Sequence, residues 1–147
     1  AGFKAAFGQQ SGTIYEGSDF LALPRFTMTE KYGGIERFRM VANALPLPAF
    51  DAEPQEPKLR TDTPSIGFSI PQALSAEITG LSCFISGQEQ PSIDVLGNRA
   101  EVRLKDAPAG ERLRLNCTMP GPVDTEGKER WRWFGMLLVS PEPAAPP

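Results

Sequence analysis

The stretch SIDVLGNRAEVRL, residues 92–104, has the pattern of a β-hairpin. Apolar and polar residues alternate up to Val95, and the alternation resumes at Val102 beyond a Gly97-Asn98 pair. Glycine followed by asparagine is a turn dipeptide of tight hairpins, because both residues tolerate a positive φ. The stretch therefore predicts two antiparallel strands joined by a short turn, within a larger sheet.

Similar strand patterns recur on both sides of this hairpin. They are short, separated by turn-rich loops, and read SIGFSI (65–70), AEITGLSCFISG (76–87), ERLRLNCTM (111–119) and WRWFGMLLV (131–139). Short alternating strands at regular spacing are typical of a sandwich of two sheets. We expect a mainly β protein in which residues 65–140 form a small antiparallel β-sandwich and residues 141–147 form a tail.

Residues 1–45 have a different organisation. In residues 2–8, phenylalanines alternate with other residues, which predicts a strand, and a polar loop follows. The stretch GGIERFRMVANAL (33–45) has apolar residues at helical spacing between two glycines and Pro46, which predicts a helix. We expect a strand, a loop and a helix ahead of the sandwich.

Residues 46–64, PLPAFDAEPQEPKLRTDTP, contain five prolines and no apolar period. Proline fixes φ and lacks a backbone donor, so neither a helix nor a central strand fits this stretch. It is predicted to be a stiff linker and is the clearest domain boundary in the chain.

The 147 residues include no histidine, which excludes a Ser-His-Asp triad and any metal site built on histidine. No two aspartates have a spacing that indicates acid–base catalysis, and each stands in a turn-like context. The net charge is -3 and the basic residues are scattered, so we expect no nucleic-acid partner. No apolar run is long enough to span a membrane.

Two cysteines, Cys83 and Cys117, lie inside strand-like apolar runs. A disulfide between neighbouring strands would suit an oxidising compartment, such as the bacterial periplasm or the exterior. Two buried free thiols are the alternative, since cysteine packs as a small apolar residue, and they would be compatible with the cytoplasm.

Several stretches taken together resemble the C-terminal part of bacterial polysaccharide deacetylases of the NodB-homology class. They are GFKAAFGQQSG (2–12), LALPRF (21–26), ERFRMVANALPLPAFD (36–51), LNCTMPG (115–121) and RWRWFGMLLV (130–139). Their order and spacing are similar to that family across most of the chain. The resemblance implies that residues 1–45 are the last strand, loop and helix of a distorted (β/α) barrel, followed by a β-rich module.

The resemblance also implies which parts are missing. Family members bind a divalent, zinc-like metal through one aspartate and two histidines spaced H-x-x-x-H, and these motifs lie upstream. Without histidine this chain can hold none of them, so no catalytic residue carries over and no cofactor is expected here. The expected partner is the missing catalytic segment or another copy of the chain, because an unpaired barrel strand invites association.

Six residues are candidates for contact with a polysaccharide. Trp131 and Trp133 alternate and share one face of a strand, where they could stack on sugar rings or pack in a core. Arg25 of LPRF could face a sugar hydroxyl or a carboxylate, or hold its own loop by binding backbone carbonyls. The other three are loop residues that could contact substrate or serve only as ordinary loop side chains, namely Gln9, Gln10 and Tyr15.

Two functional hypotheses follow. In the first, the chain is the C-terminal fragment of a metal-dependent hydrolase that removes acetyl groups from a cell-surface or exported polysaccharide, and it is inactive alone. In the second, it is a non-catalytic carbohydrate-binding or assembly module. The tryptophan face discriminates between them, because sugar stacking requires that face to be exposed.

Overall fold

The structure, a computed structural model, describes residues 2–61, 64–87, 89–105 and 110–141. Its elements, with η denoting a 3₁₀ helix, are in chain order η1 (Glu30–Tyr32), α1 (Ile35–Ala42), β1 (Leu45–Pro46), β2 (Phe50–Glu53), β3 (Ile66–Ser69), η2 (Gln72–Gly80), β4 (Ser82–Ile85), β5 (Ser92–Leu96), β6 (Arg99–Arg103), β7 (Arg112–Pro120) and β8 (Trp131–Val139). The tail expected at 141–147 lies outside the described residues, except for Pro141.

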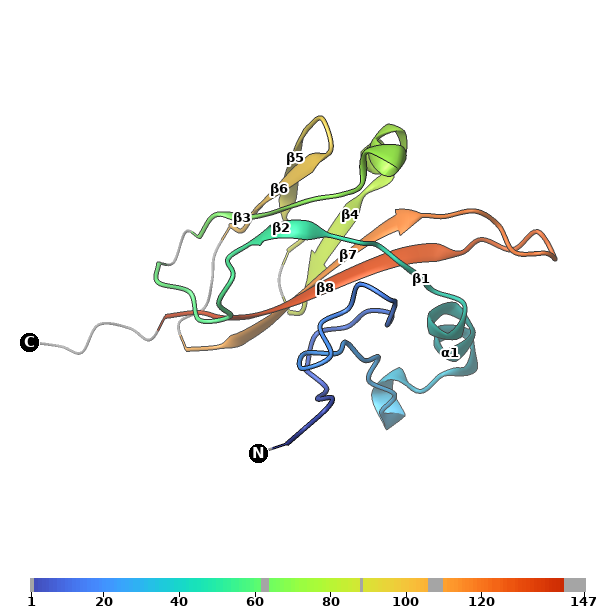
Figure 1. Ribbon diagram of the computed structural model, residues 1–147, viewed down its shortest axis with the longest axis horizontal. Coiled ribbons are helices and arrows are strands. Elements are labelled where there is room, and N and C mark those ends of the chain that lie inside the picture. The colour runs from blue at the N-terminus through green and yellow to red at the C-terminus, as the bar shows by residue number, and fades with distance from the viewer. Residues whose placement is uncertain (1, 62–63, 88, 106–109, 142–147) are drawn as a thin grey trace, which may run out of the picture.

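The strands of the described residues form two four-stranded sheets (Figure 1). One sheet has the order β1-β8-β7-β4 and the other β2-β3-β6-β5. Neighbouring strands are antiparallel, except that β1 runs parallel to β8. The prediction of a mainly β protein with a small antiparallel β-sandwich is confirmed.

The core lies between the two sheets. Alternate residues of β7 from Leu113 to Met119 are at most 1% exposed, and the residues between them point away from the core. Phe134 of β8 meets Phe68 of β3 across the core, with ring centroids 4.8 Å apart. Each large apolar side chain removed from water stabilises the fold by about 1.5–3 kcal/mol, so this alternation determines which face of each sheet is buried.

The hairpin at residues 92–104 forms as predicted. Strands β5 and β6 pair in register, and Gly97 adopts a φ of 62°, which a residue with a side chain rarely takes. The side chain of Asn98 donates a hydrogen bond to the Ile70 carbonyl at 2.7 Å. The turn is therefore also attached to the end of β3.

Residues 46–64, expected to be a linker, supply parts of both sheets. Their first residue ends β1, β2 follows, and Leu47 and Leu59 are each only 2% exposed in the core. Both β1 and β2 are edge strands, where a missing proline N–H breaks no central ladder. The proline-rich stretch thus contributes no central strand, but it does contribute residues to the edge strands β1 and β2.

The strand expected over residues 76–87 forms only in its second half. Residues up to Gly80 belong to η2, and β4 begins at Ser82. Ser82 pairs with Thr118 of β7. The next residue of β7 whose backbone N–H would face β4 is Pro120, and proline has no N–H to donate. The ladder therefore ends there, and the preceding residues close their hydrogen bonds locally.

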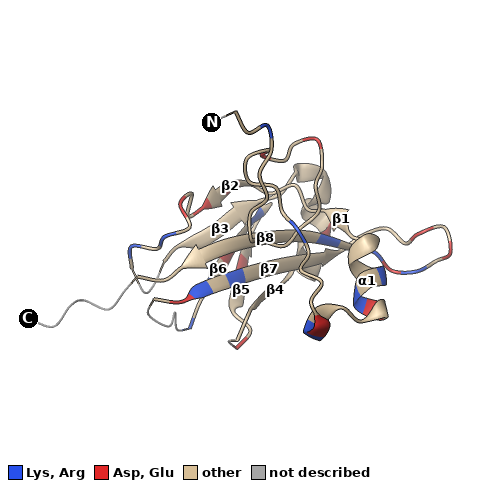
Figure 2. Ribbon diagram, turned by 90° about the horizontal axis from the view of Figure 1, so that it is seen from below, with Lys and Arg blue, Asp and Glu red and all other residues tan. Residues whose placement is uncertain are grey.

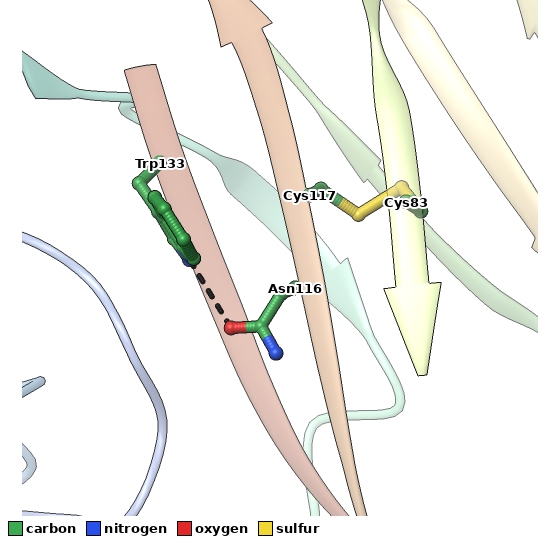
Figure 3. Close-up of a disulfide and its surroundings, with 4 residues drawn as sticks. All are labelled: Cys83, Asn116, Cys117 and Trp133. Carbon is green, nitrogen blue, oxygen red and sulfur yellow. Dashed lines mark hydrogen bonds between the residues drawn. A yellow bond between two sulfur atoms is a disulfide. The ribbon is translucent and has the colours of Figure 1, made fainter. Parts of the chain in front are cut away.

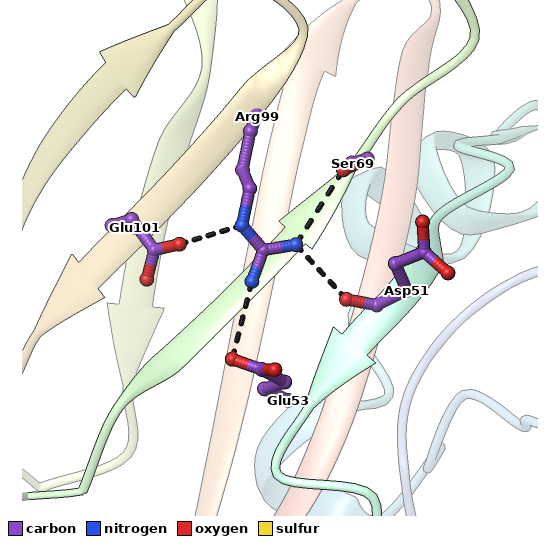
Figure 4. A network of polar contacts seen from close by, with 5 residues as sticks. All are labelled: Asp51, Glu53, Ser69, Arg99 and Glu101. Atoms are coloured by element: carbon purple, nitrogen blue, oxygen red, sulfur yellow. Dashed lines mark hydrogen bonds and ion pairs between the residues drawn. The ribbon is translucent and has the colours of Figure 1, made fainter.

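An arginine holds the edge strand β2 to its sheet (Figure 4). Arg99 of β6 donates to Glu101 at 2.6 Å, to Glu53 of β2 at 3.3 Å, and to the carbonyl of Asp51 at 3.0 Å. Asp51 has a φ of 46°, and β2 has an irregular register at this point. Arg99 therefore reaches across β3 from β6 and binds the distorted part of β2.

Cys83 of β4 and Cys117 of β7 are joined by a disulfide (Figure 3). The two residues are directly opposite one another, with Cα atoms 4.1 Å apart, and neither is exposed. This is the short separation of a non-hydrogen-bonded antiparallel pair. None of the helices in the described residues has the length and apolar character of a membrane span.

The N-terminal segment, defined as residues 2–44, crosses the outer face of the β1-β8-β7-β4 sheet (Figure 1). The strand expected over residues 2–8 is reduced to one bridge between Phe7 and Leu23, with hydrogen bonds that link Ala6 and Gly8 to residues 20–23. Residues 2–8 do not form a regular strand, because no strand of the described residues pairs with them beyond this bridge.

The helix expected over residues 33–45 forms as α1 but ends at Ala42. The backbone then turns at Asn43, and Leu45 enters β1 beside β8. The expected last turn of the helix does not form, for two reasons. Proline cannot continue a helix, and the backbone of Leu45 and Pro46 pairs with the edge of β8 instead.

Candidate functional site

The candidate residues of the N-terminal segment meet the sandwich where residues 8–13 lie over β8. A Cβ placed on Gly135 would overlap the backbone of Ser11, so only glycine permits this approach. From β7, Arg114 donates to the Gln9 carbonyl at 3.2 Å. The loop is therefore held against the sheet by backbone contact and by an arginine.

Arg25 serves this same loop. Its Nε donates to the Gly8 carbonyl at 3.1 Å, and its backbone N–H donates to the Gln10 carbonyl at 3.0 Å. The Gln10 side chain donates to the Ala22 carbonyl at 2.6 Å. Arg25 thus binds backbone carbonyls of its own loop, and the Gln10 side chain binds a backbone carbonyl of the same segment.

Gln9 lines an open groove of about 710 Å³ beside the edge of β8. The backbone N–H of Leu47 donates to the Trp133 carbonyl of β8, and that of Leu59 donates to the Val139 carbonyl. The residues between Leu47 and Leu59 turn away from β8 and form β2 in the other sheet. The outward-facing backbone groups of Gly135 and Leu137 consequently have no backbone partner in the described part of the chain. Gln9 itself accepts a long contact of 3.5 Å from Arg112.

Trp133 is occupied by packing and hydrogen bonding. Its indole N–H donates to Asn116 Oδ1 of β7 at 3.1 Å (Figure 3), and its ring meets Phe26 edge-on with centroids 5.0 Å apart. Tyr15, half-buried, lines a pocket of about 280 Å³ with Trp133 and residues 10–13. The face of Trp133 is thus covered by the N-terminal segment.

Trp131 lies apart from the other candidates, in a cleft between α1 and the loop that joins β7 to β8. The cleft has a volume of about 320 Å³ and adjoins a second depression of about 420 Å³ along the same loop. Charged residues occur both in α1 and in the loop that joins β7 to β8 (Figure 2). We call this the Trp131 cleft; its lining is Glu36, Arg39, Met40, Asn43, Asp124, Lys128, Glu129 and Trp131.

Asp124 fixes the loop wall of the Trp131 cleft. Its Oδ1 accepts hydrogen bonds from the backbone N–H groups of Lys128 at 2.9 Å and Glu126 at 2.8 Å. The hydrogen bond from Lys128 is the main reason that the pKa of Asp124 lies below its ordinary value of 3.8. The pKa of Lys128 is raised chiefly by its hydrogen bond to Glu126, so this wall stays charged near neutral pH.

The opposite wall is formed by α1, whose C-terminal end is attached to the start of β8. Arg130, next to Trp131, donates to the Asn43 carbonyl at 2.9 Å, and the Asn43 side chain donates to the Arg39 carbonyl at 2.9 Å. Arg39 forms an ion pair with Glu36 at 2.7 Å. The cleft therefore has two walls with defined positions on either side of one half-buried indole.

Sequence reasoning identified Trp131 but missed the residues around it. Met40 and Asn43 lie at the end of α1, whereas Asp124 lies far away in the chain, in the loop before β8, and none of the three is part of a motif for ligand binding. The only sequence signal was the turn-rich stretch GPVDTEGKER, which is typical of a loop.

The described residues do not fit a divalent metal of the kind that the resemblance expects in the missing catalytic part. No three His, Cys, Asp or Glu side chains gather to hold a metal ion in the part of the chain that the structure describes. The chain has no histidine, and its two cysteines form the disulfide.

No family model, curated protein or solved structure matches this chain.

Proposed function

We propose that this chain is the C-terminal part of a metal-dependent polysaccharide deacetylase and does not itself contain the metal site. The parent enzyme would remove acetyl groups from a polysaccharide. In this proposal, residues 2–44 complete a catalytic barrel whose other elements are separate from this chain, and the sandwich supports them.

The observation that carries the proposal is the exposed apolar surface of the N-terminal segment. Ten of the fifteen large apolar side chains exposed among the described residues belong to residues 2–42, although this stretch is under a third of the chain. Phe3 is 80% exposed, Phe7 64% and Phe20 58%. Exposed apolar surface of this kind supports docking against another protein surface, which is one of the roles that such surfaces have.

Helix α1 adds to this surface. It has no buried residue, and Ile35 and Phe38 of its apolar side are 60% and 52% exposed. An amphipathic helix normally buries such a side against its own domain. The remainder of a barrel is an occupant that would cover both the helix and the segment at residues 2–8.

The first test is the reading frame immediately upstream of the Ala1 codon in the source DNA. We expect it to be open and to encode an aspartate and an H-x-x-x-H motif. A stop codon followed by a start signal just before Ala1 would overturn the proposal, since no catalytic part would then be fused to this chain.

The second test is an acetate-release assay of the isolated chain on acetylated glycans with added zinc or cobalt. We expect no turnover, because no three His, Cys, Asp or Glu side chains gather to hold a metal ion among the described residues. Turnover that a chelator removes would overturn the claim that the metal site lies elsewhere.

A further inference from the structure

The two tryptophans of β8 share one face of the strand but have different environments. The Trp133 indole N–H is bonded to Asn116 and its ring is packed against Phe26. The Trp131 indole N–H has no hydrogen-bond partner among the described residues and is not buried. Packing within this chain therefore accounts for Trp133 and leaves the polar group of Trp131 accessible to a ligand.

We propose that the Trp131 cleft is a glycan-binding subsite in which a pyranose ring stacks on the Trp131 indole. The choice of a glycan as the ligand rests on the proposed function. The cleft is a holding site on the sandwich, distinct in role from the reaction centre that the rest of the parent would supply.

The chemistry of the cleft suits a sugar ring. One face of a pyranose is made of C–H groups, which pack on an indole, and its rim carries hydroxyls that need hydrogen-bond partners. Met40 adds apolar surface, while the carboxylate of Glu129 and the amide oxygen of Asn43 have no partner in the described residues. Apolar contact for the ring face and acceptors for the hydroxyls thus occur in one depression.

The walls are fixed before a ligand arrives. Asp124 receives two backbone hydrogen bonds from its own loop, and Arg130 binds the C-terminal end of α1. Fixed walls lower the entropy lost on binding. The adjoining depression extends along Thr125 and Glu126, and it leaves room for a second sugar ring of the same glycan.

The test uses the 147-residue chain and chitohexaose, followed by the two indole N–H signals in ¹H–¹⁵N NMR spectra. Because the chain has two tryptophans, Trp131→Ala assigns both signals by removing one. We expect the Trp131 signal to shift saturably and the Trp133 signal to stay in place. Trp131→Ala should lose up to roughly tenfold in affinity, as expected for loss of one aromatic contact.

Two further variants keep the proposal testable if Trp131→Ala fails to fold. Glu129→Ala alters an exposed cleft residue that has no structural partner among the described residues, and it should weaken binding. Glu77→Ala, at an exposed glutamate of η2 outside the cleft, should not. No shift of either indole, or a loss of affinity with Glu77→Ala but not with Glu129→Ala, would overturn the subsite. A deacetylase reading frame upstream would stand in that case, so the two proposals can fail separately.

Discussion

The backbone of Ser11 crosses β8 directly over Gly135, and no side chain fits between them. This contact joins two parts of the chain that are 124 positions apart (135 − 11) and brings the N-terminal segment onto the sandwich. We expect Gly135→Ala to displace residues 8–13, at a cost of about 1–3 kcal/mol in the free energy of unfolding. Urea unfolding together with limited proteolysis of the N-terminal segment measures the effect.

Gly34→Ala is the matched control for this change, because a Cβ on Gly34 meets nothing within 4 Å and its φ is -59°. Proteolysis of the N-terminal segment should be unchanged in that variant. Equal protection of residues 8–13 in Gly135→Ala and in the native chain would show that the approach of Ser11 is not a real constraint.

Replacing Arg99 with methionine should destabilise the sandwich by about 1–2 kcal/mol, because Glu53 and Glu101 lose a shared partner and β2 loses its attachment. Arg103→Met is the comparison. Arg103 forms a single exposed pair with Asp94, which we expect to contribute nothing measurable. Urea midpoints of the two variants decide the matter, and equal losses would contradict a special role for Arg99.

Replacing both cysteines with alanine should cost about 2–4 kcal/mol in the free energy of unfolding, because the bond closes a loop spanning 34 positions in the unfolded chain. Thiol titration of the native protein under denaturing, non-reducing conditions should find no free thiol. Two free thiols in protein purified without reductant would contradict the bond.

The Asp124 loop should depend on pH in one direction only. Because the folded pKa of Asp124 is lowered from 3.8, ionised Asp124 stabilises the loop above that value. This stabilisation should be lost as the pH falls through the lower folded pKa. NMR titration of the Asp124 carboxyl group and of the Lys128 amide measures it, and Asp124→Asn should abolish the transition. A carboxyl titration at or above 3.8 would contradict the hydrogen bonding seen here.

Local patterns determined most of the sandwich. The alternation in β7 and β8 and the Gly97-Asn98 turn predicted strands that form nearly as expected, because a period of two leaves one face to bury. The absence of histidine excluded several kinds of catalytic site without reference to any fold. These conclusions depend on residues that are neighbours in the sequence.

Contacts between distant residues decided the remainder. Nothing local shows that Pro120 stops the β4 ladder, or that residues 46–64 fill the edges of both sheets. Trp131 and Trp133 are indistinguishable in the sequence, two positions apart in one strand. Only the tertiary structure covers Trp133 with Phe26 and Asn116 and leaves Trp131 in a cleft, because burial depends on which other segments reach each side chain.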